Sequence, residues 1–144
     1  GVAKIAQDQA DYFGVSAFYE ARQLREAGIQ KPILILGYTP AENYKDMVDF
    51  DITATVKNLD VVKALVTAAR RVDKVAKVWV KVDTGMHRLG LEPDQVLFFI
   101  KKLQGFPNLE IEGIFTHFAD ADGDREFTKV QLERFKKVIR RFCS

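Results

Sequence analysis

The chain has 144 residues, 47% apolar and 29% charged, which is the composition of an ordinary globular domain and excludes a disordered, collagen-like or membrane-spanning chain. Its 22 basic and 20 acidic residues leave a formal charge of +2, too small for a protein that binds nucleic acid through the phosphates. The single cysteine, Cys143, cannot form an internal disulfide, so we expect a reducing, cytoplasmic location.

Strand-like and helix-like segments alternate along the chain. Runs rich in β-branched and aromatic residues predict five strands, at 12–17, 33–37, 52–56, 78–82 and 111–115. Amphipathic segments around them predict six helices, at 2–10, 18–27, 41–48, 58–72, 94–103 and 124–142. Asn58 is a candidate N-cap for one of these helices. Such alternation predicts an α/β protein whose parallel strands are joined by crossover helices.

The alternation alone does not decide between a small open sheet and part of a (β/α)₈ barrel. A barrel needs about eight strands and typically ~250 residues, and five strands leave both edges of the sheet unpaired. No Gly-x-Gly-x-x-Gly turn follows the first strand and no Walker-type phosphate loop is present, which removes the usual nucleotide-binding folds. No linker or compositional break divides the sequence, so residues 1–144 are expected to form one structural unit.

The densest cluster of chemically active residues surrounds the end of the fourth predicted strand. Side chains alternate along a strand, so one face of it carries Val78, Val80 and Val82. The opposite face carries Trp79, Lys81 and Asp83. The valines are expected to pack under helices, which leaves the charged residues on the other side, where each needs a partner or a ligand. The loop that follows lies at the carboxyl end of a strand, where α/β proteins place their sites.

A second cluster follows the fifth predicted strand, at 116–122. His117 is followed by carboxylates three and five residues later. One interpretation is a metal-dependent hydrolase or lyase, in which His117 and Asp122 bind the metal together with Asp83 from the first loop. The competing interpretation is a polar loop in which Asp122 or Asp124 caps the next helix. His117 stands at the end of an apolar strand, where a neutral imidazole would need hydrogen-bond partners.

Two specific motifs define these clusters, Lys81-Val-Asp-Thr-Gly-Met-His-Arg-Leu-Gly90 and Thr116-His-Phe-Ala-Asp-Ala-Asp122. Together they closely resemble the pyridoxal-phosphate-dependent alanine racemases and their serine racemase relatives, and the resemblance continues in order over the rest of the chain. It implies an N-terminal (β/α)₈ barrel that carries the cofactor, then a β-rich domain, in a homodimer. In that frame residues 1–144 are a partial barrel covering about strands two to six, without the first strand and the last two.

The resemblance implies roles for four residues. Arg88 matches the arginine that contacts the cofactor's phenolic oxygen and the substrate carboxylate, tasks that suit a guanidinium fork. His117 matches a histidine that supports the arginine at the pyridine nitrogen. Leu36 matches an apolar residue lining the cofactor, with ordinary barrel core as the alternative. Lys81 matches a lysine often carbamylated in the family, with an unmodified lysine paired with Asp83 as the alternative.

The resemblance also implies that no catalytic residue lies in this sequence. The family's cofactor-binding lysine lies in a Val-Lys-Ala-x-Ala-Tyr-Gly-His-Gly segment on the first strand, and its opposite-face tyrosine comes from the β-rich domain of the partner subunit. Neither segment occurs here. We therefore expect a fragment of an enzyme that interconverts L- and D-alanine to supply cell-wall peptidoglycan. By itself the chain is expected to be inactive and to retain the cofactor weakly.

Three alternatives remain open. One is serine racemase activity in the same family, because the groups that sense the substrate hydroxyl lie largely outside this sequence. Another is a noncatalytic binding or scaffold domain derived from the barrel, whose open edges are covered by a partner. The third is the metal-dependent hydrolase or lyase described above.

Overall fold

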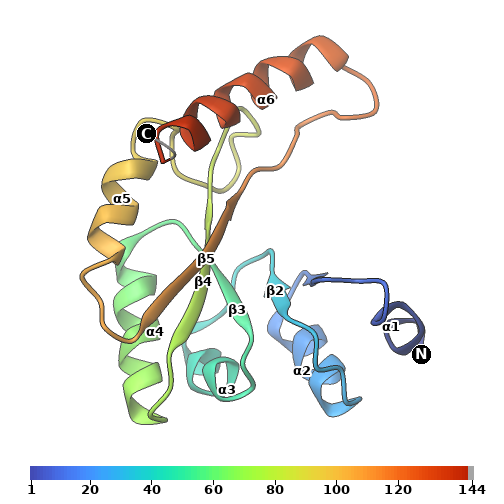
Figure 1. Cartoon of the computed structure of the whole chain (residues 1–144), viewed down its shortest axis with the longest axis vertical. Coiled ribbons are helices and arrows are strands. Elements are labelled where there is room, and N and C mark those ends of the chain that lie inside the picture. Colours follow the sequence, from blue (N-terminus) through green and yellow to red (C-terminus); the bar gives the residue numbers. More distant parts are fainter. Residues whose placement is uncertain (143–144) are drawn as a thin grey trace.

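Five parallel strands in the spatial order β1-β2-β3-β4-β5 form the centre of the computed structural model, which describes residues 1–142 (Figure 1). The strands are β1 (Phe13–Val15), β2 (Ile33–Ile35), β3 (Thr53–Val56), β4 (Ala76–Lys81) and β5 (Leu109–Phe115). Each predicted strand is found, so the parallel α/β class is confirmed. Because chain order and spatial order coincide, the sheet lacks the reversal of strand order that defines doubly wound folds.

The helices are α1 (Val2–Ala6), α2 (Phe18–Glu26), α3 (Tyr44–Asp49) after the short 3₁₀ helix η1 (Ala41–Asn43), α4 (Leu59–Arg71), α5 (Val96–Leu103) and α6 (Arg125–Arg140). Helices α2 to α5 connect successive strands, whereas α1 precedes β1 and α6 follows β5. Asn58 caps α4 by accepting a hydrogen bond from the amide of Val61 at 3.0 Å, as predicted. The predicted first helix is shorter than expected and buries no residue, since α1 ends at Ala6.

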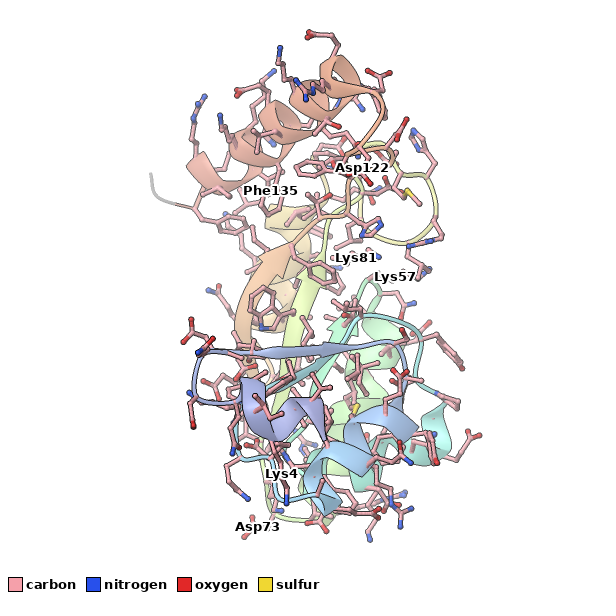
Figure 2. All side chains as sticks on the ribbon, turned by 90° about the vertical axis from the view of Figure 1, so that its right-hand side faces the viewer. Lys4, Lys57, Asp73, Lys81, Asp122 and Phe135 are labelled. Atoms are coloured by element: carbon pink, nitrogen blue, oxygen red, sulfur yellow. The ribbon has the colours of Figure 1, made fainter. Side chains whose placement is uncertain are left out.

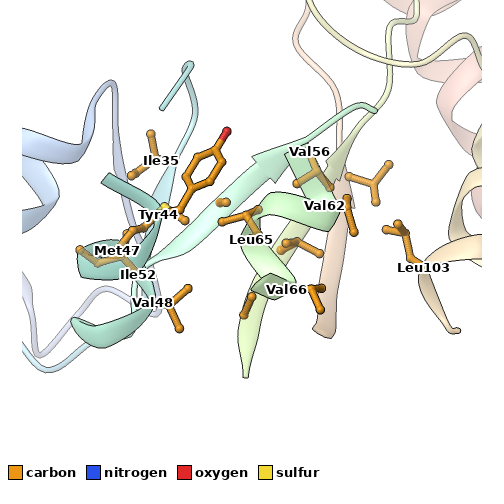
Figure 3. Packing of buried hydrophobic residues seen from close by; sticks show 14 of the residues in the cluster. Ile35, Tyr44, Met47, Val48, Ile52, Val56, Val62, Leu65, Val66 and Leu103 are labelled. Atoms are coloured by element: carbon orange, nitrogen blue, oxygen red, sulfur yellow. The ribbon is translucent and has the colours of Figure 1, made fainter. Parts of the chain in front are cut away.

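The hydrophobic core lies between the sheet and α2 to α5. Alternation along β4 sends the three valines toward the helices, and all three are at most 1% exposed. They pack with buried side chains of the neighbouring helices, including Val62 and Leu65 of α4 and Leu103 of α5 (Figure 3). The prediction that the valine face lies under helices is therefore confirmed.

The opposite face of the sheet carries a group of polar and aromatic side chains around Trp79. The indole packs edge-on against the rings of Tyr12 and Phe115, with centroids 5.6 and 6.2 Å away. The Tyr12 hydroxyl and the Thr53 hydroxyl both donate to Oε2 of Glu112, the latter at 2.8 Å. Tyr12 thus connects the start of β1 to β5, the two edge strands, across this inner face.

A β-bulge in β5 places Glu112 in this group. Val78 of β4 pairs with Ile111 of β5, whereas the next residue, Trp79, pairs with Gly113. Glu112 is therefore the extra residue between two paired positions, and the strand's alternation changes there.

Within residues 1–142, no helix combines the length and the apolar character that a membrane crossing needs. Cys143, on which the expectation of a cytoplasmic location rests, lies outside the described residues.

Candidate functional site at the carboxyl edge of the sheet

A pocket of about 230 Å³ opens at the carboxyl ends of the central strands. Its lining includes Gly37 after β2, Thr55 of β3, Lys57 after β3, Lys81 at the end of β4 and Leu89 from the following loop. Figure 2 shows Lys57 and Lys81 close together at this level of the molecule. Both predicted clusters lie at the same edge of the sheet, as strand polarity requires.

Lys81 is a buried ammonium group facing other cations. The residue is 5% exposed, and Nζ lies 5.5 Å from the centre of the Phe115 ring. Burial and the nearby guanidinium of Arg88 lower the pKa of Lys81, and Asp83 only partly offsets them. Lys81 takes part in none of the ion pairs formed within residues 1–142. The alternative in which Lys81 pairs with Asp83 is therefore not what the structure shows.

The Asp83 carboxylate is directed into its own loop instead. Its Oδ1 accepts the backbone amides of Gly85 at 2.9 Å and His87 at 3.0 Å. Burial raises the pKa of Asp83, but the hydrogen bonds from these amides outweigh burial and hold the pKa below its ordinary value. The carboxylate therefore stabilises the turn that carries Arg88.

Two further features close this turn, which we call the arginine loop (residues 83–90). The amide of Asp83 donates to the carbonyl of Leu91 at 2.8 Å, and the amide of Leu91 donates to the carbonyl of Lys81 at 2.9 Å. Gly90 has φ 139°, and a Cβ there would lie 2.6 Å from the backbone nitrogen of Asp83. Arg88 thus extends from a closed, glycine-dependent loop, with its side chain exposed to solvent.

The second motif, which we call the histidine loop (residues 116–122), contacts the arginine loop through two threonines. The Thr116 hydroxyl donates to the carbonyl of Val82 at 2.9 Å. A hydroxyl has one hydrogen, so the 2.8 Å contact between the Thr84 and Thr116 hydroxyls has Thr84 as donor. The ends of β4 and β5 are joined by this chain of hydrogen bonds.

The His117 side chain is exposed, because the chain leaves the sheet immediately after β5. Only its backbone carbonyl is held, accepting a hydrogen bond from Gln131 of α6 at 3.3 Å.

The acidic residues after His117 have structural roles. Asp124 is the N-cap of α6 and accepts the amide of Phe127 at 2.9 Å, which confirms the capping interpretation for this residue. Asp120 accepts the amide of Gly123 at 3.1 Å. Within residues 1–142, no three His, Cys, Asp or Glu side chains gather closely enough to hold a metal ion, so the hypothesis of a metal-dependent enzyme has no support.

Leu36, the fourth predicted site residue, follows β2 and is 41% exposed. Its neighbour Gly37 lines the pocket that also includes Lys81 and Leu89. Leu36 is therefore not part of the buried core formed by residues 1–142. Its exposed apolar side chain lies at the edge of the sheet where both motifs end.

Sequence patterns missed two contributors to this region. Lys57 lines the pocket beside Lys81 and helps to lower the pKa of Lys81, although it belongs to neither motif. Gln131 is fully buried and hydrogen-bonds to both loops. A polar residue on an amphipathic helix is ordinarily exposed, so no local sequence pattern distinguishes Gln131 from the exposed polar residues of α6.

Comparison with known proteins agrees with this arrangement. A family model described as alanine racemase, N-terminal domain, matches residues 1–143. Alanine racemase 1 of Oceanobacillus iheyensis is 45% identical over 133 residues, which cover 90% of this chain and 35% of that protein. The chain therefore spans about a third of the length of this relative.

Solved structures show the same likeness. Alanine racemase from Clostridium difficile 630, in complex with cycloserine, superposes with a TM-score of 0.92 at 36% identity, covering 97% of this chain and 39% of that one. Histidine racemase from Leuconostoc mesenteroides superposes with a TM-score of 0.84 at 26% identity, covering 93% of this chain and 37% of that one.

Proposed function

Because the chain belongs to the alanine racemase family, through the N-terminal domain of that family, we propose that it is the cofactor-binding part of a pyridoxal-phosphate-dependent racemase acting on alanine. The observation that carries this proposal is the shared edge of the sheet, where the arginine loop, Lys81 and the histidine loop meet. Sites of α/β proteins lie at this edge because the loops after parallel strands converge there.

We further propose that residues 1–144 supply strands two to six of an eight-stranded barrel. The order β1 to β5 without reversal supports this, as does the limited share of the relatives' length that the chain covers. Completion of the barrel would pair the outer edges of β1 and β5. The remaining strands, a second domain and a homodimeric partner belong to this proposal, as does a cytoplasmic supply of D-alanine for peptidoglycan.

The residues present fit such a cofactor. Pyridoxal phosphate, when bound, supplies an electron sink that makes the α-hydrogen of an amino acid acidic. Arg88 presents an exposed guanidinium that would contact the phenolic oxygen of the cofactor and the substrate carboxylate. Leu36 would line the cofactor, and His117 would support the arginine at the pyridine nitrogen. Each of these side chains is solvent-accessible here and therefore available to such contacts.

Lys81 is proposed to be carbamylated. The ammonium group would first lose a proton to give the neutral amine, and this amine would attack CO₂ and release a second proton, so a cation beside Arg88 would become an anion. The structure supports this because a buried ammonium among cations is unfavourable, and the lowered pKa increases the share of neutral amine that can react. Supply of ¹³CO₂ to the full-length protein should give a carbamate resonance that is absent in Lys81→Met.

Alanine is the proposed substrate because relatives that are 41–45% identical to this chain are named for it. The histidine racemase shows that the same fold serves another side chain at lower identity. Alanine, serine and histidine should therefore be compared in one assay. The noncatalytic scaffold gains no support from these comparisons.

The test uses the full-length protein that contains residues 1–144 and, separately, the 144-residue chain, each with added pyridoxal phosphate. The full-length protein should convert L-alanine to D-alanine, whereas the separate chain should not, because it contains no Val-Lys-Ala-x-Ala-Tyr-Gly-His-Gly segment. D-alanine formed by the separate chain would refute the assignment of the catalytic groups to other segments.

A further inference from the structure

The side chain of Gln131, in the middle of α6, is the only glutamine among residues 1–142 that is buried, at 0% exposure. A buried amide is costly unless its donors and acceptor are hydrogen-bonded. The partners that Gln131 finds are therefore informative about what α6 does.

Those partners lie on both loops of the site. Nε2 donates to the Thr84 hydroxyl at 3.2 Å and to the carbonyl of His117 at 3.3 Å. Oε1 accepts the backbone amide of Ala119 at 2.9 Å. One side chain thus holds the arginine loop with one hydrogen bond and the histidine loop with two.

The bond to Thr84 continues into the sheet. Thr84 donates to Thr116, and Thr116 donates to the carbonyl of Val82, so the Gln131 amide ends a chain of three hydrogen bonds. Every hydroxyl in the chain acts once as donor and once as acceptor. Loss of the amide would remove one of the two hydrogen bonds of the buried Thr84 hydroxyl, together with the bonds that hold the Ala119 amide and the His117 carbonyl.

Close packing of α6 on the arginine loop reinforces this contact. Arg134 donates from Nη1 to the carbonyl of Thr84 at 2.8 Å. A Cβ on Gly85 would lie 2.8 Å from the ring of Phe127 and 3.5 Å from Cγ of Gln131, so the loop backbone rests directly on the helix.

We propose that Gln131 is a positioning residue, which fixes the arginine loop and the histidine loop relative to each other and so sets where Arg88 and His117 reach the cofactor and substrate. The effect on catalysis rests on the proposed function. The coupling of the two loops through Gln131 does not depend on that function.

The experiment compares Gln131→Met and Gln131→Glu in the full-length protein by hydrogen–deuterium exchange and by alanine racemisation. Methionine keeps the length of the side chain and removes all three bonds. Glutamate keeps the acceptor for Ala119 and loses both donated bonds. The matched control is Val138→Ala, a 2% exposed position on the same helix that touches the core and not the hydrogen-bond chain.

Backbone amides of both loops should exchange at least tenfold faster in Gln131→Met than in the wild type. The increase in exchange rate should be smaller in Gln131→Glu and less than threefold in Val138→Ala. The KM for alanine should rise while kcat falls, because Arg88 is displaced in the folded enzyme. A purely structural role would reduce the amount of active enzyme and leave KM unchanged.

The coupling would be overturned if Gln131→Met accelerated exchange in one loop only, or if Val138→Ala accelerated exchange in both loops as much as Gln131→Met does. An unchanged KM in Gln131→Met, with both loops loosened, would overturn the positioning role. If the unsubstituted protein shows no racemisation, the proposed function fails, and the exchange results still decide whether Gln131 couples the loops.

Discussion

Replacing Asp83 should open the arginine loop while the sheet beneath it stays intact. The Asp83 carboxylate accepts two backbone amides, from Gly85 and His87, and no other acceptor is bonded to these amides within residues 1–142. His87 also has φ 53°, a left-handed conformation that a non-glycine residue keeps only when its surroundings hold it. We therefore compare Asp83→Asn and Asp83→Ala in the full-length protein.

The size of the effect follows from the two hydrogen bonds. A hydrogen bond to a charged group contributes about 1.5–3 kcal/mol net, and neutral bonds are roughly half as strong. Alanine removes both bonds, so the loop should lose about 3 kcal/mol or more, which corresponds to at least ~100-fold faster exchange of the Gly85 and His87 amides. Asparagine keeps an acceptor oxygen, and about tenfold faster exchange is expected.

Hydrogen–deuterium exchange of peptides covering residues 83–91 measures this directly. The control is Asp11→Asn, an exposed aspartate before β1 that should leave the loop unchanged. Because the folded-state pKa of Asp83 is lowered, its contribution is complete above the unfolded value of about 3.9 and is lost as pH falls through the folded value. Equal exchange in wild type and Asp83→Ala would refute the role of the carboxylate.

Three other substitutions test separate parts of the structure. Gly90→Ala should open the arginine loop about as much as Asp83→Ala, because its Cβ would clash with a backbone nitrogen; unchanged exchange would contradict the clash. Tyr12→Phe should lower the free energy of unfolding of the protein by about 1–3 kcal/mol, measured as the urea midpoint, because it removes the hydroxyl bonded to Glu112; an unchanged midpoint would contradict this. Since burial raises the pKa of Tyr12 and of Tyr44, the variant should keep only the late titration of Tyr44. Because burial lowers the folded-state pKa of Lys81, the free energy of unfolding of the wild type in CO₂-free buffer should rise with pH between the folded pKa and the unfolded value of about 10.4. Lys81→Met should lack this rise. Equal pH profiles of the two proteins would show that burial of the ammonium group costs no stability.

Local sequence patterns predicted the strands and the direction of their side chains well. The alternation of β4 sends valines to the helices and Trp79 and Lys81 to the other face, and burial follows this alternation from Ala76 to Val80. The five strands and the cap at Asn58 follow from equally local rules. The differences lie mainly at element ends, where α1 and β1 are shorter than predicted because few tertiary contacts extend them.

The site depended on information that no local pattern contains. The bulge at Glu112 arises from the pairing of two strands, and its partners Tyr12 and Thr53 are 100 and 59 residues away. Gln131 is buried only because the arginine loop and the histidine loop lie on α6 together. The exposure of His117 follows from the path of the chain after β5, which the residues around the histidine do not determine.

The most direct test of the account measures D-alanine formation by the full-length protein, with pyridoxal phosphate bound, for wild type, Arg88→Lys and Arg71→Lys. Lysine keeps the charge of Arg88 and loses the planar fork of donors, whereas Arg71 is an exposed residue at the end of α4. Wild type and Arg71→Lys should racemise L-alanine equally, and Arg88→Lys should be at least tenfold slower. Absence of D-alanine in the wild type, or equal rates in all three proteins, would contradict the account.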